Sequence, residues 1–196
     1  MMHFLALGDS YTIGESVTEA ERWPNQLAEM FAAAGQPVVV TIIARTGWTT
    51  DELSAAIDQT QPQGPYDLVS LLIGVNNQYR GRDTATYRRE FRQLLERAIA
   101  LAGGHASRVL VLSIPDWGVT PFAAGHNQTQ ITQEIDTFNA INHTEAEMLA
   151  VAYVDVTPFS RLAATDPALL AADGLHPSGK MYEEWARLVW KRLKHG

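Results

Sequence analysis

The sequence contains no cysteine. Disulfide bonds, thiolate metal sites and cysteine nucleophiles are therefore excluded. Basic residues are also scarce, since 15 Lys and Arg stand against 22 Asp and Glu, a formal net charge of −7. A nucleic-acid-binding surface needs clustered Lys and Arg to replace the counterions of the phosphates. We therefore expect no nucleic-acid partner.

Long apolar runs are missing as well, because none approaches the ~20 residues that a membrane span requires. The first residues lack a basic stretch, and their apolar run, Phe4–Leu7, is too short for a secretory signal. We expect a cytoplasmic protein without integral membrane association. Its 196 residues, 46% of them hydrophobic, suit one domain that covers residues 1–196. No pattern indicates an oligomeric state.

Short apolar runs alternate with segments of helical periodicity. The runs are Phe4–Leu7, Val38–Ala44, Leu68–Ile73, Val109–Ile114 and the weaker Ala152–Val156. Their hydrophobicity is continuous rather than alternating, which is typical of a parallel sheet covered on both faces. Apolar stripes at helical spacing lie within Trp23–Ala34, Thr50–Ile57, Tyr87–Ile99, Ile131–Leu149 and Met181–Val189. This alternation predicts a doubly wound α/β fold.

Polar and small residues follow the predicted strands. Ser10 follows the first strand, Gly47 the second and Asn76 the third, while Asp173 and His176 precede the last helix. Ligands of such folds bind beyond the carboxyl ends of the strands. We therefore expect these residues to meet at one edge of the sheet.

These residue types match the requirements of acyl transfer through a serine. That reaction needs a nucleophile, a base, a group that orients the base, and donors for the developing oxyanion. Ser10 is a candidate nucleophile and His176 a candidate base, and Asp173 can fix the tautomer of the imidazole. Gly47 offers a backbone N–H and Asn76 a side-chain amide. Each of these residues, taken alone, is also common in helix caps, loops or turns. The hypothesis therefore rests on their order along the chain and on their expected position at one edge of the sheet.

The sequence resembles the GDSL or SGNH hydrolases, which are named for Ser, Gly, Asn and His in separate blocks. The corresponding blocks here are Gly8-Asp9-Ser10-Tyr11, Gly47, Gly74-Val75-Asn76-Asn77 and Asp173-Gly174-Leu175-His176-Pro177. They occur in the family's order and span nearly the whole chain. Tyr11 stands where the family usually has Leu, and Asn77 where it usually has Asp.

The resemblance implies a flavodoxin-like, three-layer α/β/α fold with a five-stranded parallel sheet. It also implies Ser10 as nucleophile, His176 as base and Asp173 as the orienting carboxylate. The oxyanion hole would consist of the Ser10 and Gly47 N–H groups and the Asn76 side chain. The expected function is that of a serine hydrolase acting on carboxylic esters or thioesters of small to medium acyl chains.

Other sites are not favoured, and we expect neither a cofactor nor a metal. Gly174, Gly179 and Lys180 copy part of a phosphate-binding loop, but Met181 stands where Ser or Thr would hold Mg²⁺. The glycines after the first strand do not form a dinucleotide-binding pattern. The histidines lack the spacing of a zinc-binding helix.

The substrate is less well defined than the reaction. Candidate substrate-binding residues are Tyr11, Trp48, Asn77, Tyr79 and Trp117, with Phe122 as a further wall residue. An equally good alternative is that about half of the aromatic side chains only pack the loops.

The net charge is unfavourable for strongly anionic esters unless Arg45 or Arg80 offsets it locally. Because the expected reaction is ester hydrolysis, we expect the partner to be a small-molecule ester. An O-acetyl-carbohydrate deacetylase remains an alternative, as does a non-catalytic small-ligand-binding domain.

Overall fold

The computed structural model describes the backbone of residues 1–195 and the side chains of residues 1–194. Gly196, which the predicted domain includes, lies outside the described residues. The described chain forms a five-stranded parallel sheet with the strand order β2-β1-β3-β4-β5. The strands are β1 (Met2–Gly8), β2 (Val38–Ala44), β3 (Leu68–Leu72), β4 (Val109–Leu112) and β5 (Ala152–Val154). The predicted α/β fold class is confirmed.

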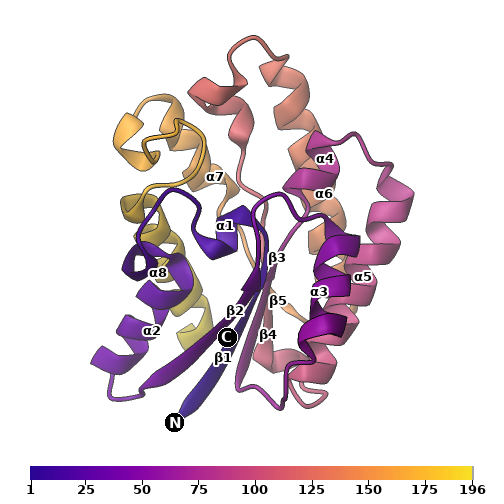
Figure 1. The fold of residues 1–196 in the computed structure, drawn as a ribbon, viewed down its shortest axis with the longest axis vertical. Helices are drawn as coiled ribbons and strands as arrows, with labels where there is room; N and C mark the ends of the chain where they lie inside the picture. Colours follow the sequence, from indigo (N-terminus) through magenta and orange to yellow (C-terminus); the bar gives the residue numbers. More distant parts are fainter. Residues whose placement is uncertain (196) are drawn as a thin grey trace.

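Helices cover both faces of the sheet and complete three layers (Figure 1). One face is covered by α2 (Trp23–Ala33) and α8 (Gly179–His195). The other is covered by α3 (Thr50–Thr60), α5 (Thr84–Leu101) and α6 (Gln128–Met148). Shorter elements are α1 (Ser10–Ile13), α4 (Val75–Tyr79), α7 (Thr157–Ser160) and the 3-10 turns Glu19–Glu21, Ala106–Arg108, Trp117–Val119, Pro121–Ala123, Arg161–Ala164 and Pro167–Leu169.

The burial of the strands explains their continuous hydrophobicity. Every residue of β3 and β4 is buried, because both strands lie inside the sheet and under helices on both faces. The edge strand β2 is only partly covered. Trp23 and Trp185 are fully buried on one side of the sheet, as Tyr87 and Phe91 are on the other. The core therefore consists of two apolar layers separated by the sheet.

The fourth and fifth strands each end two residues earlier than predicted, because side chains take over the backbone hydrogen bonds. Asn139 accepts from the Ile114 N–H at 2.7 Å and donates to the Ile114 carbonyl at 2.9 Å. The N–H of Val156 donates to the Ser113 hydroxyl at 2.7 Å. The apolar character of the sequence thus continues past the point where the strand ladder stops.

The predicted helices are all present, and most extend beyond the apolar stripe. Polar caps determine where they begin. Asp83 accepts from the N–H of Thr86 at the start of α5, and Asn127 accepts from that of Gln130 at the start of α6. In the described part of the chain, no helix is both long and apolar enough to cross a membrane.

Candidate active site

A cavity of about 190 Å³ opens at the carboxyl ends of the strands. We call it the central cavity. It brings together residues that the sequence places far apart, including seven of the predicted site residues. Its lining consists of Ser10, Tyr11, Thr46, Gly47, Val75, Asn76, Tyr79, Trp117, Phe122, Leu175 and His176.

Ser10 lies at the sharp turn between β1 and α1. A Cβ on Gly8 would lie 2.2 Å from the Thr12 hydroxyl oxygen and 2.5 Å from the Leu72 carbonyl oxygen, so only glycine fits there. The side chain of Asp9 caps α1 by accepting from the N–H of Tyr11 at 3.0 Å. Because Asp9 serves as the cap, the Ser10 hydroxyl is left available on the cavity wall.

Asp9 is a buried carboxyl group next to the candidate nucleophile. Burial raises its pKa to about 7, although hydrogen bonds from the backbone of Tyr11 and Gly74 act in the opposite direction. Its Oδ2 atom has no hydrogen-bond partner among the described residues. Burial therefore makes the ionised form of Asp9 less favourable than that of an exposed aspartate.

Asp173 contacts the imidazole of His176 across a tight turn. Its Oδ2 atom lies 2.6 Å from His176 Nδ1, and its Oδ1 atom accepts from the N–H groups of Leu175 and His176, both at 2.9 Å. Ser16, far away in the sequence, donates its hydroxyl to Oδ2 at 2.7 Å. Burial alone would raise the pKa of Asp173, but the hydrogen bonds from His176, Ser16 and Leu175 outweigh it and hold the pKa below its usual value.

The ring of Tyr11 packs edge-on against the His176 imidazole, with 5.8 Å between ring centroids. On its other side it contacts Trp185 of α8 at 6.2 Å. Only 3% of Tyr11 is exposed, and this burial raises the pKa of its hydroxyl well above the usual value. Tyr11 therefore supports the imidazole as a neutral aromatic wall.

Three candidate oxyanion donors face the central cavity. No hydrogen bond from the backbone N–H of Ser10 or Gly47 is formed within the described residues. The Asn76 amide uses one hydrogen to donate to the Trp48 carbonyl at 2.9 Å, which leaves its second hydrogen available. Gly47 adopts a φ of 89°, a conformation that strains other residues. Arg80 donates to its carbonyl at 2.7 Å and fixes this turn.

The positive charge of Arg80 is not free to bind an anion. Besides the Gly47 carbonyl, its guanidinium contacts Glu52 at 3.4 Å. Arg45 is exposed and does not line the central cavity. Neither Arg45 nor Arg80 therefore supplies the positive charge that would favour binding of a strongly anionic ester.

The predicted substrate-binding residues divide into two groups. Tyr11, Tyr79 and Trp117 line the central cavity, whereas Trp48 and Asn77 do not. Asn77 is fully buried, and its amide accepts from the Thr50 N–H at 3.1 Å and donates to the Thr50 hydroxyl at 2.7 Å. Asn77 thus joins α4 to the start of α3. Trp48 is partly buried against the hydrophobic core, and its carbonyl accepts from Asn76.

Sequence reasoning did not single out three lining residues, Val75, Leu175 and Thr46. Val75 and Leu175 lie inside the sequence blocks already described, and Thr46 precedes Gly47. Their positions within or next to these blocks could have identified them as lining residues. Phe122, a predicted wall residue, also lines the cavity and is 46% exposed.

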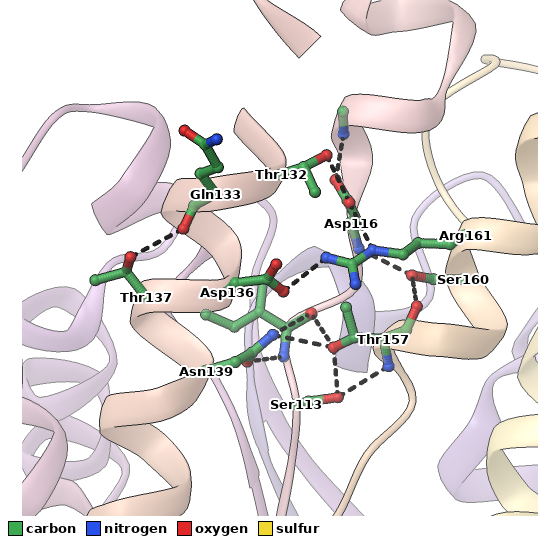
Figure 2. A network of polar contacts seen from close by, with 12 residues as sticks. Ser113, Asp116, Thr132, Gln133, Asp136, Thr137, Asn139, Thr157, Ser160 and Arg161 are labelled. Atoms are coloured by element: carbon green, nitrogen blue, oxygen red, sulfur yellow. Dashed lines mark hydrogen bonds and ion pairs between the residues drawn. The ribbon is translucent and has the colours of Figure 1, made fainter. Parts of the chain in front are cut away.

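The loop that carries Trp117 is held by a polar network between β4, α6 and α7 (Figure 2). The Asp116 carboxylate is completely buried and lies 2.9 Å from Nε of Arg161, which also contacts Asp136 at 2.6 Å. Thr132 donates to the same carboxylate at 2.8 Å. Because Asp116 is thereby fixed, the neighbouring Trp117 has a defined position in the cavity wall.

The described residues contain no group of three or more His, Asp or Glu side chains placed to hold a metal ion. The absence of a cofactor, as expected from the sequence, stays a prediction.

Solved structures of similar fold were found by comparison. TesA matches with 21% identity and a TM-score of 0.76, over 98% of both chains. Axe2, an acetylxylan esterase from Geobacillus stearothermophilus, matches with 19% identity and a TM-score of 0.75, over 100% of this chain and 95% of that one. The esterase EstA from Pseudoalteromonas sp. matches with 18% identity and a TM-score of 0.70, over 99% and 97%. At these identities the matches show the fold.

A comparison with curated proteins finds no relative. The model of the GDSL-like Lipase/Acylhydrolase family, in contrast, matches residues 6–184, which is most of the chain. The chain therefore belongs to the GDSL-like lipase/acylhydrolase family, whose members are carboxylic ester hydrolases.

Proposed function

We propose that the chain hydrolyses carboxylic esters or thioesters of small to medium acyl groups through a serine nucleophile. In this proposal Ser10 attacks, His176 acts as base and Asp173 orients the imidazole. The observation that carries it is the 2.6 Å contact of Asp173 with His176 Nδ1, on an imidazole that shares the central cavity with Ser10.

The reaction proceeds in two halves. The Ser10 hydroxyl transfers its proton to His176 Nε2 while its oxygen bonds to the ester carbonyl carbon. When the tetrahedral intermediate collapses, the bond to the leaving alcohol or thiol breaks and His176 returns the proton to it. Water then attacks the acyl-serine with His176 again as base, and the acid leaves.

The negative charge on the carbonyl oxygen is stabilised by the Ser10 and Gly47 N–H groups and the Asn76 amide. Support comes from the spare donor capacity of these groups and from the fixed geometry of the Gly47 turn. Donors of this kind stabilise the transition state strongly because they are oriented before the charge develops.

The dimensions of the central cavity favour a short acyl group. Its volume of about 190 Å³ is below the ~300–1,000 Å³ usual for drug-sized ligands. Val75, Leu175 and Phe122 give it apolar walls. We therefore expect acetyl and other short acyl esters to be better substrates than long-chain esters.

A series of 4-nitrophenyl esters from acetate to dodecanoate tests this proposal. We expect kcat/KM to fall beyond the shortest chains. We also expect Ser10→Ala to lose more than about 10³-fold of the activity, since the catalytic residues act as a unit. No hydrolysis above the level of Ser10→Ala would favour the alternative, a non-catalytic small-ligand-binding domain.

An O-acetyl-carbohydrate deacetylase is the second candidate function. It is favoured by a polar hollow that adjoins the central cavity. Axe2, which has a similar fold, is an acetylxylan esterase. The chain-length series cannot distinguish this candidate from a simple short-chain esterase.

The proposal treats residues 1–196 as a single SGNH hydrolase domain, and the family match over residues 6–184 supports this. The cytoplasmic location and the lack of a nucleic-acid partner stay predictions from the sequence. Cell fractionation with an antibody against the chain tests the location.

A further inference from the structure

A second hollow of about 480 Å³, which we call the side groove, adjoins the central cavity. Tyr79 and Trp117 line both, so the two hollows lie side by side and share these two side chains as walls. The far wall comes from the start of α6 and the loop before it, with His126, Gln130 and Glu134. The side groove is thus adjacent to the candidate active site, and apart from Tyr79 and Trp117 it is lined by other residues.

Aromatic rings form one part of the side groove. Trp117 contacts Tyr79 edge-on at 5.5 Å and His126 edge-on at 5.6 Å between ring centroids. Tyr79 is 55% exposed although it is a large aromatic residue. Exposed aromatic rings with polar tips suit ligands that are apolar on one side and hydrogen-bonding on the other.

A chain of hydrogen bonds orients the polar groups of the groove. The indole N–H of Trp117 donates to Gln78 at 2.8 Å, and the Gln78 amide donates to Glu134 at 2.7 Å. Gln130 donates to the other oxygen of Glu134 at 2.8 Å. Each carboxylate oxygen therefore has one donor and keeps capacity for a second.

These groups exclude two classes of ligand. An alkyl chain in the side groove would bury Glu134 and Gln130 without new hydrogen bonds, which is costly. A phosphate would meet the Glu134 carboxylate, and neither Lys nor Arg is found among the described residues that line the groove. A neutral molecule with several hydroxyl groups fits, because each hydroxyl both donates and accepts.

We propose that the side groove binds the carbohydrate part of an O-acetylated saccharide, whose acetyl group lies in the central cavity beside Ser10. This inference rests on the proposed ester hydrolysis and narrows its substrate class. A sugar ring would stack on the exposed ring of Tyr79, and its hydroxyls would bond to Gln130 and Glu134.

Two neutral acetyl esters test the inference: methyl 4-O-acetyl-xylopyranoside, which keeps two free hydroxyl groups on its sugar ring, and triacetin, which lacks a sugar ring. We expect the wild-type protein to prefer the sugar by about tenfold or more in kcat/KM, since a few hydrogen bonds supply this much. We expect Gln130→Leu to raise KM for the sugar about five- to tenfold and to affect triacetin less.

Gln133→Leu is the matched control, because Gln133 lies on the same helix, is exposed and does not line the groove. It should leave both activities unchanged. Equal kcat/KM for the two esters, or an equal effect of Gln130→Leu on both, overturns the inference while ester hydrolysis stands. If neither ester is hydrolysed faster by the wild type than by Ser10→Ala, the proposed function itself fails.

Discussion

The hydroxyl of Ser16 donates at 2.7 Å to the same Asp173 oxygen that lies 2.6 Å from His176 Nδ1. Ser16 has a φ of 66°, a left-handed conformation that is uncommon for residues other than glycine. Such strain persists where the surrounding structure requires a particular side-chain position. Here the hydroxyl completes the set of donors around Asp173, so Ser16 holds the carboxylate that we propose orients the base.

Replacing Ser16 with alanine should lower kcat/KM about five- to tenfold, because the Asp173 carboxylate loses a charge-assisted hydrogen bond near the surface. The pKa of Asp173 should rise. Steady-state kinetics at neutral pH measure the loss of kcat/KM, and an NMR titration of the Asp173 carboxyl measures the rise of its pKa.

Ser16→Gly is the control that separates the hydroxyl from the strained backbone. Glycine adopts a positive φ without cost, so this variant should keep the stability of the wild type or exceed it. It should lose activity as Ser16→Ala does. A fully active Ser16→Gly enzyme would show that the hydroxyl has no positioning role.

Replacing Asn76 with alanine should mainly affect catalysis, whereas replacing its neighbour Asn77 should mainly affect stability. Asn76→Ala removes a proposed oxyanion donor and should lower kcat about 10²–10³-fold. Asn77→Ala leaves the polar groups of Thr50 unpaired in the interior and should cost about 1–3 kcal/mol of stability, with a much smaller effect on kcat. Steady-state kinetics and urea denaturation separate the two effects, and similar kcat losses for both variants would count against the assignment of Asn76.

The buried Asp9 should make stability depend on pH. Its pKa is raised to about 7 in the folded protein, whereas an unfolded Asp titrates near ~3.9. Between these values the folded state binds more protons than the unfolded state, so the free energy of unfolding should fall by a few kcal/mol as the pH rises from about 4 to about 7. Urea denaturation at a series of pH values measures this slope.

Asp9→Asn removes the titrating group but keeps the shape and the capping oxygen. In this variant the slope between pH 4 and pH 7 should become much smaller, and stability at pH 7 should approach that at pH 5. An unchanged slope in Asp9→Asn would show that a different group causes the pH dependence.

Arg161→Leu should destabilise the protein by about 2–4 kcal/mol, because it leaves the fully buried Asp116 carboxylate without its cation. KM should rise as well, since the adjacent Trp117 loop loosens. The matched control is Arg187→Leu, whose partners Glu183 and Glu184 lie at the surface, and it should change stability by less than about 1 kcal/mol. Equal effects of the two substitutions would contradict the anchoring role of Arg161.

The fold could be predicted from the sequence because its strands are short, continuous apolar runs. A run such as Leu68–Ile73 has no polar alternation, and the structure buries it on both faces. The short helices α1 and α4 could not be predicted in this way, because four or five residues are too few to show an apolar stripe. They begin within three residues of the ends of β1 and β3, and they carry Ser10 and Asn76.

The positions of candidate site residues could be predicted from the sequence where the residues closely follow a strand. Ser10, Gly47 and Asn76 follow adjacent parallel strands, so they meet at one edge of the sheet. Side-chain direction within a loop is not determined by such spacing, and Asn77 therefore turned out to bind Thr50. The contact of Ser16 with Asp173 depends on the conformation of two distant loops, for which the sequence contains no periodic signal.

The most direct test of Ser10 as nucleophile is covalent labelling with a fluorophosphonate, followed by mass spectrometry of the peptides. The serine oxygen displaces fluoride from phosphorus, and His176 takes the proton. We predict one adduct per chain, on Ser10, and a strong reduction of labelling in His176→Ala. A wild-type protein that hydrolyses 4-nitrophenyl acetate but carries no adduct, or carries it on another residue, would contradict the proposed mechanism.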